Sequence, residues 1–451
     1  MIIKDFKILE KMLRPRSICN LYHFKPIEGF SIDSRSIREK EAFIAIKGQY
    51  KDGHTFIQEA VNKGACFIVA EKYVPTKPLV SYFIVEDAYS SLKEINIYLR
   101  KILNPFVYAV TGSIGKTTTK DMLHFLIEGR FRVLKNKGTE NNFLGVTKTI
   151  FSLEDEKVLV LELGTNAKGE IESLAKISMP DVGIITFIKP VHLEGLKSLR
   201  GIFEEKISLL KGNPKIKAVL NRDDYYLSKI KDNKNIYWFG SDKKNDLFFT
   251  LQNRKNGSSI FLLQNKYRLE VPSYLEGFIA NYSAAILGAH LLGISLNELA
   301  ERMSTFRNYS PMRVEIKELA DFSVLNDAYN ANPYAVSQAL KNLKHYPSPK
   351  IAILGDMLEL GKRSVYYHKQ LAPHIIKSNF DYCLTFGEYS QHTKGALEKL
   401  GYRKAFHFSS HKEIAQFIRK KVFLRKHFDK RYLIFLKGSR KMGLEKVLEY
   451  L

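Results

Sequence analysis

The chain has 451 residues, which is too long for one ordinary hydrophobic core and fits roughly two to four domains. Its hydrophobic content of 45% is typical of a folded globular protein, and no run of about eighteen apolar residues predicts a transmembrane helix. The formal net charge of +24 could indicate a nucleic-acid binder. The lysines and arginines are spread along the whole chain, however, without a nucleic-acid-reading motif. We therefore expect no nucleic-acid partner and a solvated Lys-rich surface that can attract polyanionic small substrates.

The cysteines and the first residues bear on the cellular compartment. Cys19, Cys66 and Cys383 lie far apart, with neither metal-ligand spacing nor an even-numbered disulfide framework. Residues 1–7 alternate charged with apolar side chains and lack the continuous apolar core of a signal peptide. We expect a cytoplasmic protein with reduced thiols and no integral membrane segment. A monomer is the default expectation.

Residues 1–104 are predicted to form a small N-terminal α/β domain. Apolar runs at 42–46 and 66–70 have the length of strands, and residues 56–63 between them have a helical pattern. Asn104 and Pro105 end a helix near Ile102, because proline disfavours helical backbone in the residue before it. This break marks the first domain boundary.

Residues 105–310 alternate β-rich runs with helical stretches, which predicts a doubly wound, mostly parallel sheet covered on both faces. Residues 236–270 differ, since short strands separated by polar turns favour an antiparallel flap, and an amphipathic helix is expected at 281–292. The predicted strands of the parallel part are 106–110, 158–161, 182–187 and 218–220.

Residues 311–451 are predicted to form a third, Rossmann-like domain, because strands again alternate with helical stretches. Its predicted strands are 323–325, 351–354, 382–386 and 432–436.

A phosphate-binding loop is the most specific local signal. The apolar run 106–110 stops at Thr111–Thr118 (TGSIGKTT), and a helical segment follows. Glycines let backbone N–H groups approach phosphate oxygens, the lysine can bridge the outer phosphates, and the threonine hydroxyl can ligate Mg²⁺. The full nucleotide-loop pattern would need glycine where Val110 stands, so this is a shortened variant. A Gly-Lys-Thr sequence also occurs in ordinary surface turns, but the strand before it and the helix after it favour nucleotide binding.

Four further side chains could converge on this loop, although each also has an ordinary structural explanation. Glu162 ends a predicted strand, where a carboxylate can hold Mg²⁺ or be merely solvated. His192 follows another strand, and a lone histidine is more often a surface or core residue than a ligand. Lys206 lies in a helical stretch, where a solvated lysine is the usual explanation, and Asn281 could simply cap its helix.

Taken together, these segments resemble the Mur ligases, the ATP-dependent amide-forming enzymes of peptidoglycan synthesis. The short loop at 111–118 is similar to that family's loop, which lacks the first glycine. The resemblance continues through 161–171, 192–195 and 221–224, and it covers essentially the full chain.

The ends of the chain resemble one branch of that family. Residues 33–35 (DSR), Gly48 and residues 52–54 (DGH) resemble a uridine-nucleotide domain shared by the members that add the third stem residue and the D-Ala-D-Ala dipeptide. The third domain resembles the dipeptide-adding members, and the Asp-Asn-Pro-Arg signature of the third-residue members is absent. The segments that carry this second resemblance are 326–333 (NDAYNANP), 355–361 (GDMLELG) and 437–440 (KGSR).

The resemblance implies a set of site residues. The catalytic group would be Lys116, Lys206, His192 and Glu162. Metal ligands would be Thr117, Glu162, His192 and Lys206, the last carrying a CO₂-derived carbamate that turns a cation into a carboxylate-like anion. ATP would contact Gly112, Ser113, Gly115, Lys116, Thr117, Thr118, Asn281, Arg313, Asp327 and Tyr329. The substrates would contact Ser34, Arg35, Asp52, His54, Asn141, Asn142, Asn330 and Asn332.

The implied function is ATP- and Mg²⁺-dependent joining of D-alanyl-D-alanine to UDP-N-acetylmuramoyl-tripeptide through an acyl phosphate, a step in building the cell wall that maintains cell shape and division. Alternatives at this point are a sibling ligase that adds the third stem residue, a phosphate-loop ATPase of other function, and a non-catalytic nucleotide- or nucleic-acid-binding protein. The ATPase alternative leaves Lys206 and the 33–35 segment unexplained.

Overall fold

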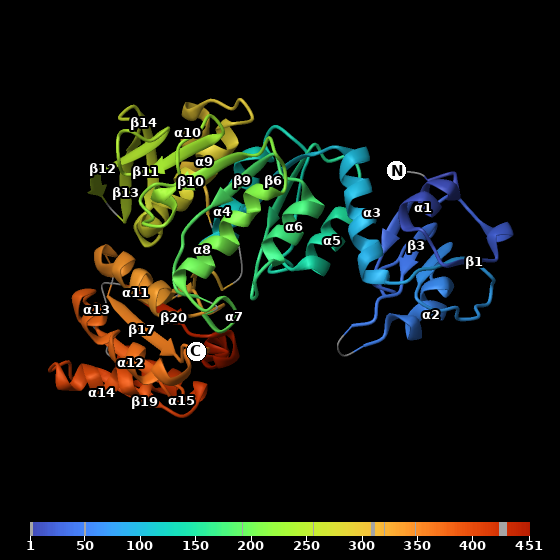
Figure 1. Ribbon diagram of the computed structural model, residues 1–451. Coiled ribbons are helices and arrows are strands. Elements are labelled where there is room, and N and C mark those ends of the chain that lie inside the picture. The colour runs from blue at the N-terminus through green and yellow to red at the C-terminus, as the bar shows by residue number, and fades with distance from the viewer. Residues whose placement is uncertain are drawn as a thin grey trace. The chain divides into compact units, whose positions relative to one another are not determined.

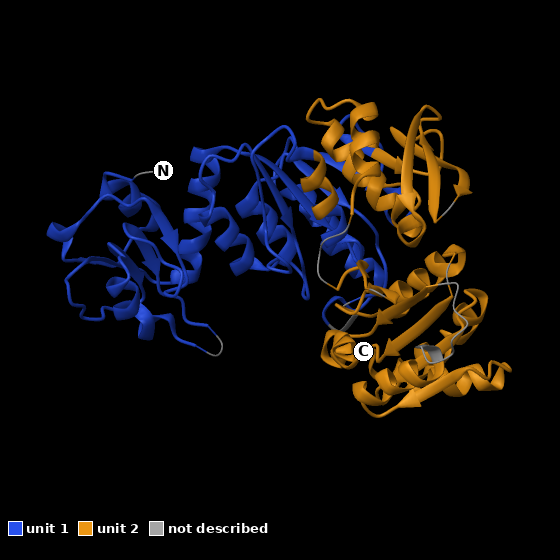
Figure 2. Cartoon of the chain, turned by 180° about the vertical axis from the view of Figure 1, so that it is seen from behind, with its two compact units in different colours: residues 1–120, 127–220, 224–237 blue, residues 121–126, 221–223, 238–451 orange. Residues whose placement is uncertain are grey.

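The structure is a computed structural model that describes residues 3–48, 51–191, 193–255, 257–307, 312–319, 321–347, 349–423 and 431–451. The chain divides into two compact units, coloured separately in Figure 2. The first contains residues 1–120, 127–220 and 224–237, and the second contains residues 121–126, 221–223 and 238–451. Within the described residues the strands form three sheets of five, nine and six strands, which confirms the predicted α/β class.

The N-terminal sheet has the strand order β1-β5-β4-β3-β2. Strands β1 and β3 of this sheet are labelled in Figure 1. Among the described strands of this sheet, only β1 and β5 pair antiparallel. The predicted strands at 42–46 and 66–70 correspond to β3 and β4, and the predicted helix corresponds to α2. The elements are α1 (Phe6–Leu13), β1 (Ser17–Cys19), β2 (Gly29–Ser31), β3 (Glu41–Ile44), α2 (Ile57–Asn62), β4 (Phe67–Ala70), β5 (Ser81–Ile84) and α3 (Ala88–Leu103).

Helix α3 ends where the sequence predicts a break. Asn104 adopts a left-handed conformation with φ 43°, and its backbone N–H donates to the Arg100 carbonyl. The Arg100 guanidinium in turn donates to Asp181 Oδ2 at 2.9 Å, and the same oxygen accepts from the Val107 backbone N–H at 2.8 Å. This buried arginine therefore ties the end of α3 to the first strand of the central sheet.

The central sheet has the order β14-β13-β12-β11-β10-β9-β6-β8-β7. Strands β7, β8, β6, β9 and β10 pair in parallel, whereas β12, β13 and β14 pair antiparallel, as predicted for the flap. The prediction is wrong for the start of the 236–270 segment, because β11 pairs with β12 in parallel. The strands are β6 (Phe106–Thr111), β7 (Val133–Lys135), β8 (Val158–Glu162), β9 (Val182–Ile185), β10 (Lys217–Asn221), β11 (Ile236–Gly240), β12 (Leu247–Lys255), β13 (Ser258–Leu263) and β14 (Tyr267–Pro272).

Helices flank this sheet, and α3, α5 and α6 pack against one another (Figure 1). The inner parallel strands β8 and β9 are buried along their whole length, whereas the edge strand β7 is only half-buried. The helices are α4 (Lys116–Ile127), α5 (Phe143–Phe151), α6 (Glu170–Ser178), α7 (Leu193–Leu196), α8 (Leu199–Ile207), α9 (Ile279–His290) and α10 (Leu296–Ser304).

The C-terminal sheet has the order β15-β16-β20-β17-β18-β19, and its pairings are parallel except for β15 with β16. The predicted strands correspond to β16, β17, β18 and β20, whereas β15 and β19 were not predicted. The elements are β15 (Glu315–Glu318), β16 (Phe322–Asn326), α11 (Pro333–Asn342), β17 (Lys350–Gly355), α12 (Ser364–Lys369), α13 (Ala372–Lys377), β18 (Tyr382–Phe386), α14 (Gln391–Lys399), β19 (Ala405–Phe408), α15 (His411–Ile418) and β20 (Tyr432–Lys437).

A buried histidine organises the segment that follows β17. His368 Nε2 accepts the Met357 backbone N–H at 3.0 Å, and Nδ1 lies 2.7 Å from the Ser364 carbonyl oxygen. These partners assign a neutral imidazole with its proton on Nδ1. Burial lowers the pKa of His368, because the charged form loses its solvation.

We expect His368 to make the stability of the protein fall in mild acid. Its folded-state pKa is below the unfolded value of about 6.5, so the unfolded chain binds the proton first and stability is lost as the pH falls below that value. The slope is at most about 1.4 kcal/mol per pH unit. Thermal unfolding at pH 7.5 and 5.5 should show a smaller drop for His368→Gln than for the unsubstituted protein. An equal drop in His368→Gln and in the unsubstituted protein would contradict this role.

Candidate functional site

The phosphate loop joins β6 to α4 and is shaped by two glycines with positive φ, Gly112 at 147° and Gly115 at 79°. A Cβ on Gly112 would lie 2.0 Å from Thr186 Oγ1, so no side chain fits there. Ser113 Oγ donates to the Lys189 carbonyl at 2.8 Å and accepts the Lys189 N–H at 2.9 Å. The loop is thereby fixed to the segment after β9.

Loop residues Lys116 and Thr117 lie in the first turn of α4, where helix N–H groups and the helix dipole favour an anion. The Lys116 ammonium donates to the Gly112 carbonyl at 2.9 Å, so it folds back over the loop. Thr117 Oγ1 donates to Glu162 Oε2 at 2.7 Å. The predicted pair of Thr117 and Glu162 is therefore brought together.

Glu162 ends β8, and its side chain is almost completely buried. Besides the Thr117 hydroxyl, the Asn141 amide donates to Glu162 Oε1 at 2.8 Å. The Lys120 ammonium lies 3.9 Å from Oε2. The Asn136 side chain makes two hydrogen bonds to the Glu162 backbone: Oδ1 accepts the Glu162 N–H at 2.8 Å, and Nδ2 donates to the Glu162 carbonyl at 3.0 Å. Sequence reasoning missed Lys120 and Asn136.

The signals for these two missed residues are weak in the sequence. Lys120 lies one helical turn after Lys116, on the same face of α4, and a helix lysine is ordinarily solvated. Asn136 follows a short strand, as many loop asparagines do.

Lys206 lies near the end of α8 and is buried, with 1% of its surface exposed. Burial, and after it the charge of Lys116, lower the pKa of Lys206 well below its ordinary value, against the opposing effect of Glu205, Glu162 and Glu170. The surroundings thus favour the neutral amine. Because Lys206 is buried, it is not the solvated helix lysine that the sequence alone suggested.

The start of α6 is closed by internal carboxylates. Glu205 Oε2 accepts the Gly169 N–H at 2.7 Å, and Oε1 accepts the Ile171 N–H at 2.8 Å. Glu170 Oε2 accepts the Asn166 N–H at 2.7 Å. These bonds fix the segment between β8 and α6, which belongs to the 161–171 motif.

The predicted histidine ligand, His192, lies outside the described residues. The chain leading to it is held by Asp224, whose Oδ2 accepts the Ile188 N–H at 3.0 Å and lies 3.6 Å from the Lys189 ammonium. Asp224, the last residue of the 221–224 motif, thus acts by positioning the segment that leads to His192. Among the described residues no group of three or more His, Cys, Asp or Glu side chains forms a metal cluster. The hydroxyl and carboxylate oxygens of Thr117 and Glu162 nevertheless fit Mg²⁺, which prefers hard oxygen ligands.

The predicted substrate residues of the N-terminal domain form two separate clusters. Asp33 binds the Arg35 guanidinium through two hydrogen bonds of 2.9 and 2.7 Å. These bonds to Arg35 outweigh partial burial and hold the pKa of Asp33 well below its usual range, with Lys148 of α5 contributing at 3.6 Å. Ser34 donates to Glu59 at 3.2 Å. Arg35 remains largely exposed, at 79% of its side-chain surface.

Asp52 and His54 form the second cluster. His54 Nδ1 lies 2.6 Å from Asp52 Oδ1, and Nε2 accepts the Glu71 N–H at 3.0 Å. Both imidazole nitrogens are therefore used within the domain, and a substrate role for His54 stays a prediction.

Helix α5 connects the first cluster with the phosphate loop. Asn142 caps α5 by accepting the Gly145 N–H at 2.9 Å, and the adjacent Asn141 reaches Glu162. Lys148 of the same helix reaches Asp33. Side-chain contacts at either end, joined by the backbone of α5, thus connect Arg35 with Glu162 inside the first unit.

In the second unit, Asn281 is the third residue of α9 and is buried. It does not cap the helix, as one explanation from the sequence held, because α9 begins at Ile279 after Phe278. The Arg313 guanidinium lies over the Tyr329 ring at 4.0 Å, and the Lys437 ammonium lies 2.6 Å from Asp327 Oδ2.

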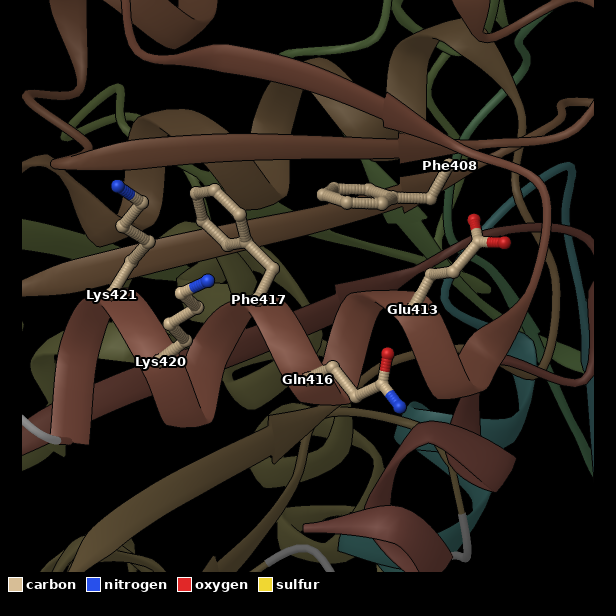
Figure 3. Close-up of a pocket in the computed structure, with 6 residues that line it drawn as sticks. All are labelled: Phe408, Glu413, Gln416, Phe417, Lys420 and Lys421. Carbon is tan, nitrogen blue, oxygen red and sulfur yellow. The ribbon is translucent and has the colours of Figure 1, made fainter.

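The two predicted asparagines of the C-terminal domain serve the local backbone. Asn330 Oδ1 accepts the Ala331 N–H at 2.8 Å, and Asn332 caps α11 by accepting the Ala335 N–H at 2.9 Å. Their substrate contacts stay a prediction. A separate pocket of about 410 Å³ beside α15 contains none of the predicted site residues (Figure 3). It is lined by Phe408, Glu413, Gln416, Phe417, Lys420 and Lys421.

Comparison with known proteins agrees with this geometry. The family models described as Mur ligase family, catalytic domain, as Mur ligase middle domain, and as Mur ligase, glutamate ligase domain match residues 26–107, 110–289 and 312–440. The UDP-N-acetylmuramoyl-tripeptide--D-alanyl-D-alanine ligase of Bacillus subtilis is 30% identical over 460 residues, covering 100% of this chain and 98% of the relative. The ligase of the same name from Rickettsia prowazekii is 30% identical, covering 93% and 94%.

Solved structures agree as well. A crystal structure of MurF from Acinetobacter baumannii matches with a TM-score of 0.84 at 26% identity, covering 98% of this chain and 97% of that one. MurF ligase from Thermotoga maritima in complex with ADP matches with a TM-score of 0.80 at 27% identity, covering 94% and 96%. The chain belongs to the Mur ligase family, as its resemblance predicted, and it is a ligase with the three-domain α/β fold of that family. Among the described residues no helix is long and apolar enough to cross a bilayer.

We expect Gly112→Ala to weaken ATP binding by at least about tenfold. The new methyl group would collide with Thr186 Oγ1, and the alanine backbone would be strained at this positive φ. The dissociation constant can be measured by titration calorimetry. Gly169→Ala is the matched control, since Gly169 has a φ of 89° but nothing within 4 Å of an added Cβ. Equal ATP affinity for Gly112→Ala and the unsubstituted protein would contradict the steric requirement.

Proposed function

We propose that this ligase joins D-alanyl-D-alanine to UDP-N-acetylmuramoyl-tripeptide and converts ATP to ADP and phosphate in the process. The observation that supports it most is the cluster of buried Thr117 and Glu162 with half-buried Asn141 beside the phosphate loop, at the carboxyl ends of parallel strands. Full-length similarity to ligases of that name supports the choice of substrates. Such a reaction belongs to peptidoglycan precursor synthesis, in the cytoplasm.

The reaction has two balanced steps. A carboxylate oxygen of the tripeptide attacks the γ-phosphorus of ATP, and the bond to the bridging oxygen breaks, which gives an acyl phosphate and ADP. The amine of the dipeptide then attacks the acyl carbon, phosphate leaves, and the nitrogen loses a proton. The phosphate loop and Lys116 hold the phosphates and stabilise the negative charge that shifts during the first step.

The metal would be Mg²⁺, held by Thr117, Glu162, His192 and a carbamate on Lys206, and when bound it would neutralise charge on the outer phosphates. The burial of Lys206 favours the neutral amine that adds CO₂. Thr117 and Glu162 already lie within hydrogen-bond distance of each other, so both oxygens can face one ion.

We further propose that the three domains divide the substrates. Arg35, with Asp33 and Lys148 behind it, presents an exposed guanidinium suited to a diphosphate on the first domain. Gly112, Ser113, Gly115, Lys116, Thr117 and Thr118 would contact ATP from the second domain. The residues Asn281, Arg313, Asp327 and Tyr329 would contact the nucleotide, with the dipeptide bound by the third domain at Asn330 and Asn332.

Phosphate release should require both UDP-tripeptide and D-Ala-D-Ala, because the tripeptide carboxylate forms the acyl phosphate and only attack by the dipeptide amine then releases the phosphate. A coupled assay over a panel of UDP-linked dipeptides and tripeptides, each with amino acids or dipeptides, measures this. Release with a UDP-dipeptide and a diamino acid would instead assign the sibling activity. ATP turnover at the same rate without either substrate would exclude a ligase reaction with them.

Changing Lys206 to Ala should abolish dipeptide addition, and short carboxylic acids should restore part of it by supplying the missing carboxylate to the metal. Lys211→Ala is the control, because Lys211 is exposed and pairs with Glu172 on the surface. Rates with and without added acetate or formate decide the question. Full activity of Lys206→Ala, or a complete loss without any rescue, would count against the carbamate.

A further inference from the structure

We infer that Lys120 is a positioning residue that holds residues 136–142 against Glu162, and that Asn136 acts with it. The inference rests on the proposed function only in taking Glu162 as the ligand of the metal. Nothing in the phosphate-binding pattern requires a lysine at position 120, so its place is argued from contacts alone.

The Lys120 ammonium is directed at one turn of the chain. Its side chain is 2% exposed, and Nζ donates to the carbonyl of Asn136 at 2.9 Å and to that of Gly138 at 3.3 Å. A buried ammonium that loses its acceptors is strongly destabilising. The turn at 136–138 is therefore held to α4 by a contact that it cannot release without a large cost.

Asn136 extends this attachment to β8. Its side chain accepts the Glu162 N–H and donates to the Glu162 carbonyl, and Nδ2 also donates to the Glu140 carbonyl at 2.8 Å. Its own carbonyl accepts from Lys120. One asparagine thus links α4, the loop and the strand that ends in the proposed ligand.

The two attachments place Asn141. Because residues 136 and 140 are fixed, the next residue, Asn141, presents its amide to Glu162 Oε1 at 2.8 Å. The Thr117 hydroxyl donates to the other carboxylate oxygen, Oε2, at 2.7 Å. Each oxygen of the carboxylate therefore has its own neutral donor, which sets the plane of the group.

The distance from Lys120 to the carboxylate fits this role. At 3.9 Å from Oε2 the ammonium is beyond the roughly 2.7–2.9 Å of a charge-assisted hydrogen bond, yet close enough to balance the buried charge. Lys120 therefore does not compete with a metal ion for the oxygen. Lys116, four residues earlier on the same helix face, is directed at Gly112 instead, so the two lysines have separate tasks.

The test compares Lys120→Met with the unsubstituted full-length protein. Amide hydrogen exchange in residues 137–142 should become at least about tenfold faster, since the loop loses its attachment to α4. The Mn²⁺ concentration for half-saturation in the presence of ADP, measured by electron paramagnetic resonance, should rise at least about threefold. ATP affinity without metal should stay within about twofold, because Lys116 and Gly112 are unchanged.

Asn136→Ala should give the same two changes, and the double variant should add little to either single one, because both residues act through one loop. Lys176→Met is the control, since Lys176 is exposed and pairs with Glu172 at 2.8 Å. It should leave exchange and metal affinity as they are. If Lys120→Met does not fold, Asn136→Ala carries the comparison with the same readouts.

Unchanged exchange at 137–142 in a folded variant, or full additivity of the two substitutions, would overturn the inference. A merely structural lysine would lower the melting temperature without changing metal affinity, and that result would overturn it as well. Exchange and Mn²⁺ binding need no turnover. They therefore decide the role of Lys120 even if the dipeptide proves not to be a substrate.

Discussion

The carboxylate of Glu162 is the constraint on which the centre of this protein depends. A buried carboxylate is tolerated only where donors and a compensating charge surround it. Here the donors come from α4 and from the loop before α5, and the charge comes from Lys120. Satisfying one side chain therefore fixes three segments that are distant in the sequence, and through Thr117 it also holds the start of the helix that follows the phosphate loop.

The same network explains how substrate recognition can be connected with chemistry. Helix α5 closely follows Asn141, which donates to Glu162, and its own Lys148 lies 3.6 Å from Asp33, so one rigid element connects the Glu162 contact with the Asp33–Arg35 pair. A rigid element transmits position more faithfully than a loop does. The long UDP-linked substrate proposed for this enzyme would lie along such an element, with its nucleotide end remote from the reacting carboxyl group.

Much of the architecture follows from the sequence, because alternation of apolar strands with helical stretches and the Asn104–Pro105 break are local signals. The strands β15 and β19 escaped prediction, since edge strands are short and partly exposed. In the site, Thr117 and Glu162 were predictable from motifs, whereas Lys120 and Asn136 were not. Their importance depends on burial and on backbone acceptors, which no residue pattern encodes.

The closure of α6 by Glu205 has a consequence for selectivity. Every helix start beside the central sheet is a potential trap for phosphate, because its N–H groups point outward. At the start of α6 the backbone N–H groups already donate to the protein's own carboxylates, and at the start of α5 one donates to an asparagine oxygen. The first turn of α4, within the described residues, carries no acidic side chain. The starts of α5 and α6 are thus occupied by the protein's own side chains, whereas the described first turn of α4 presents no acidic side chain to a highly charged nucleotide.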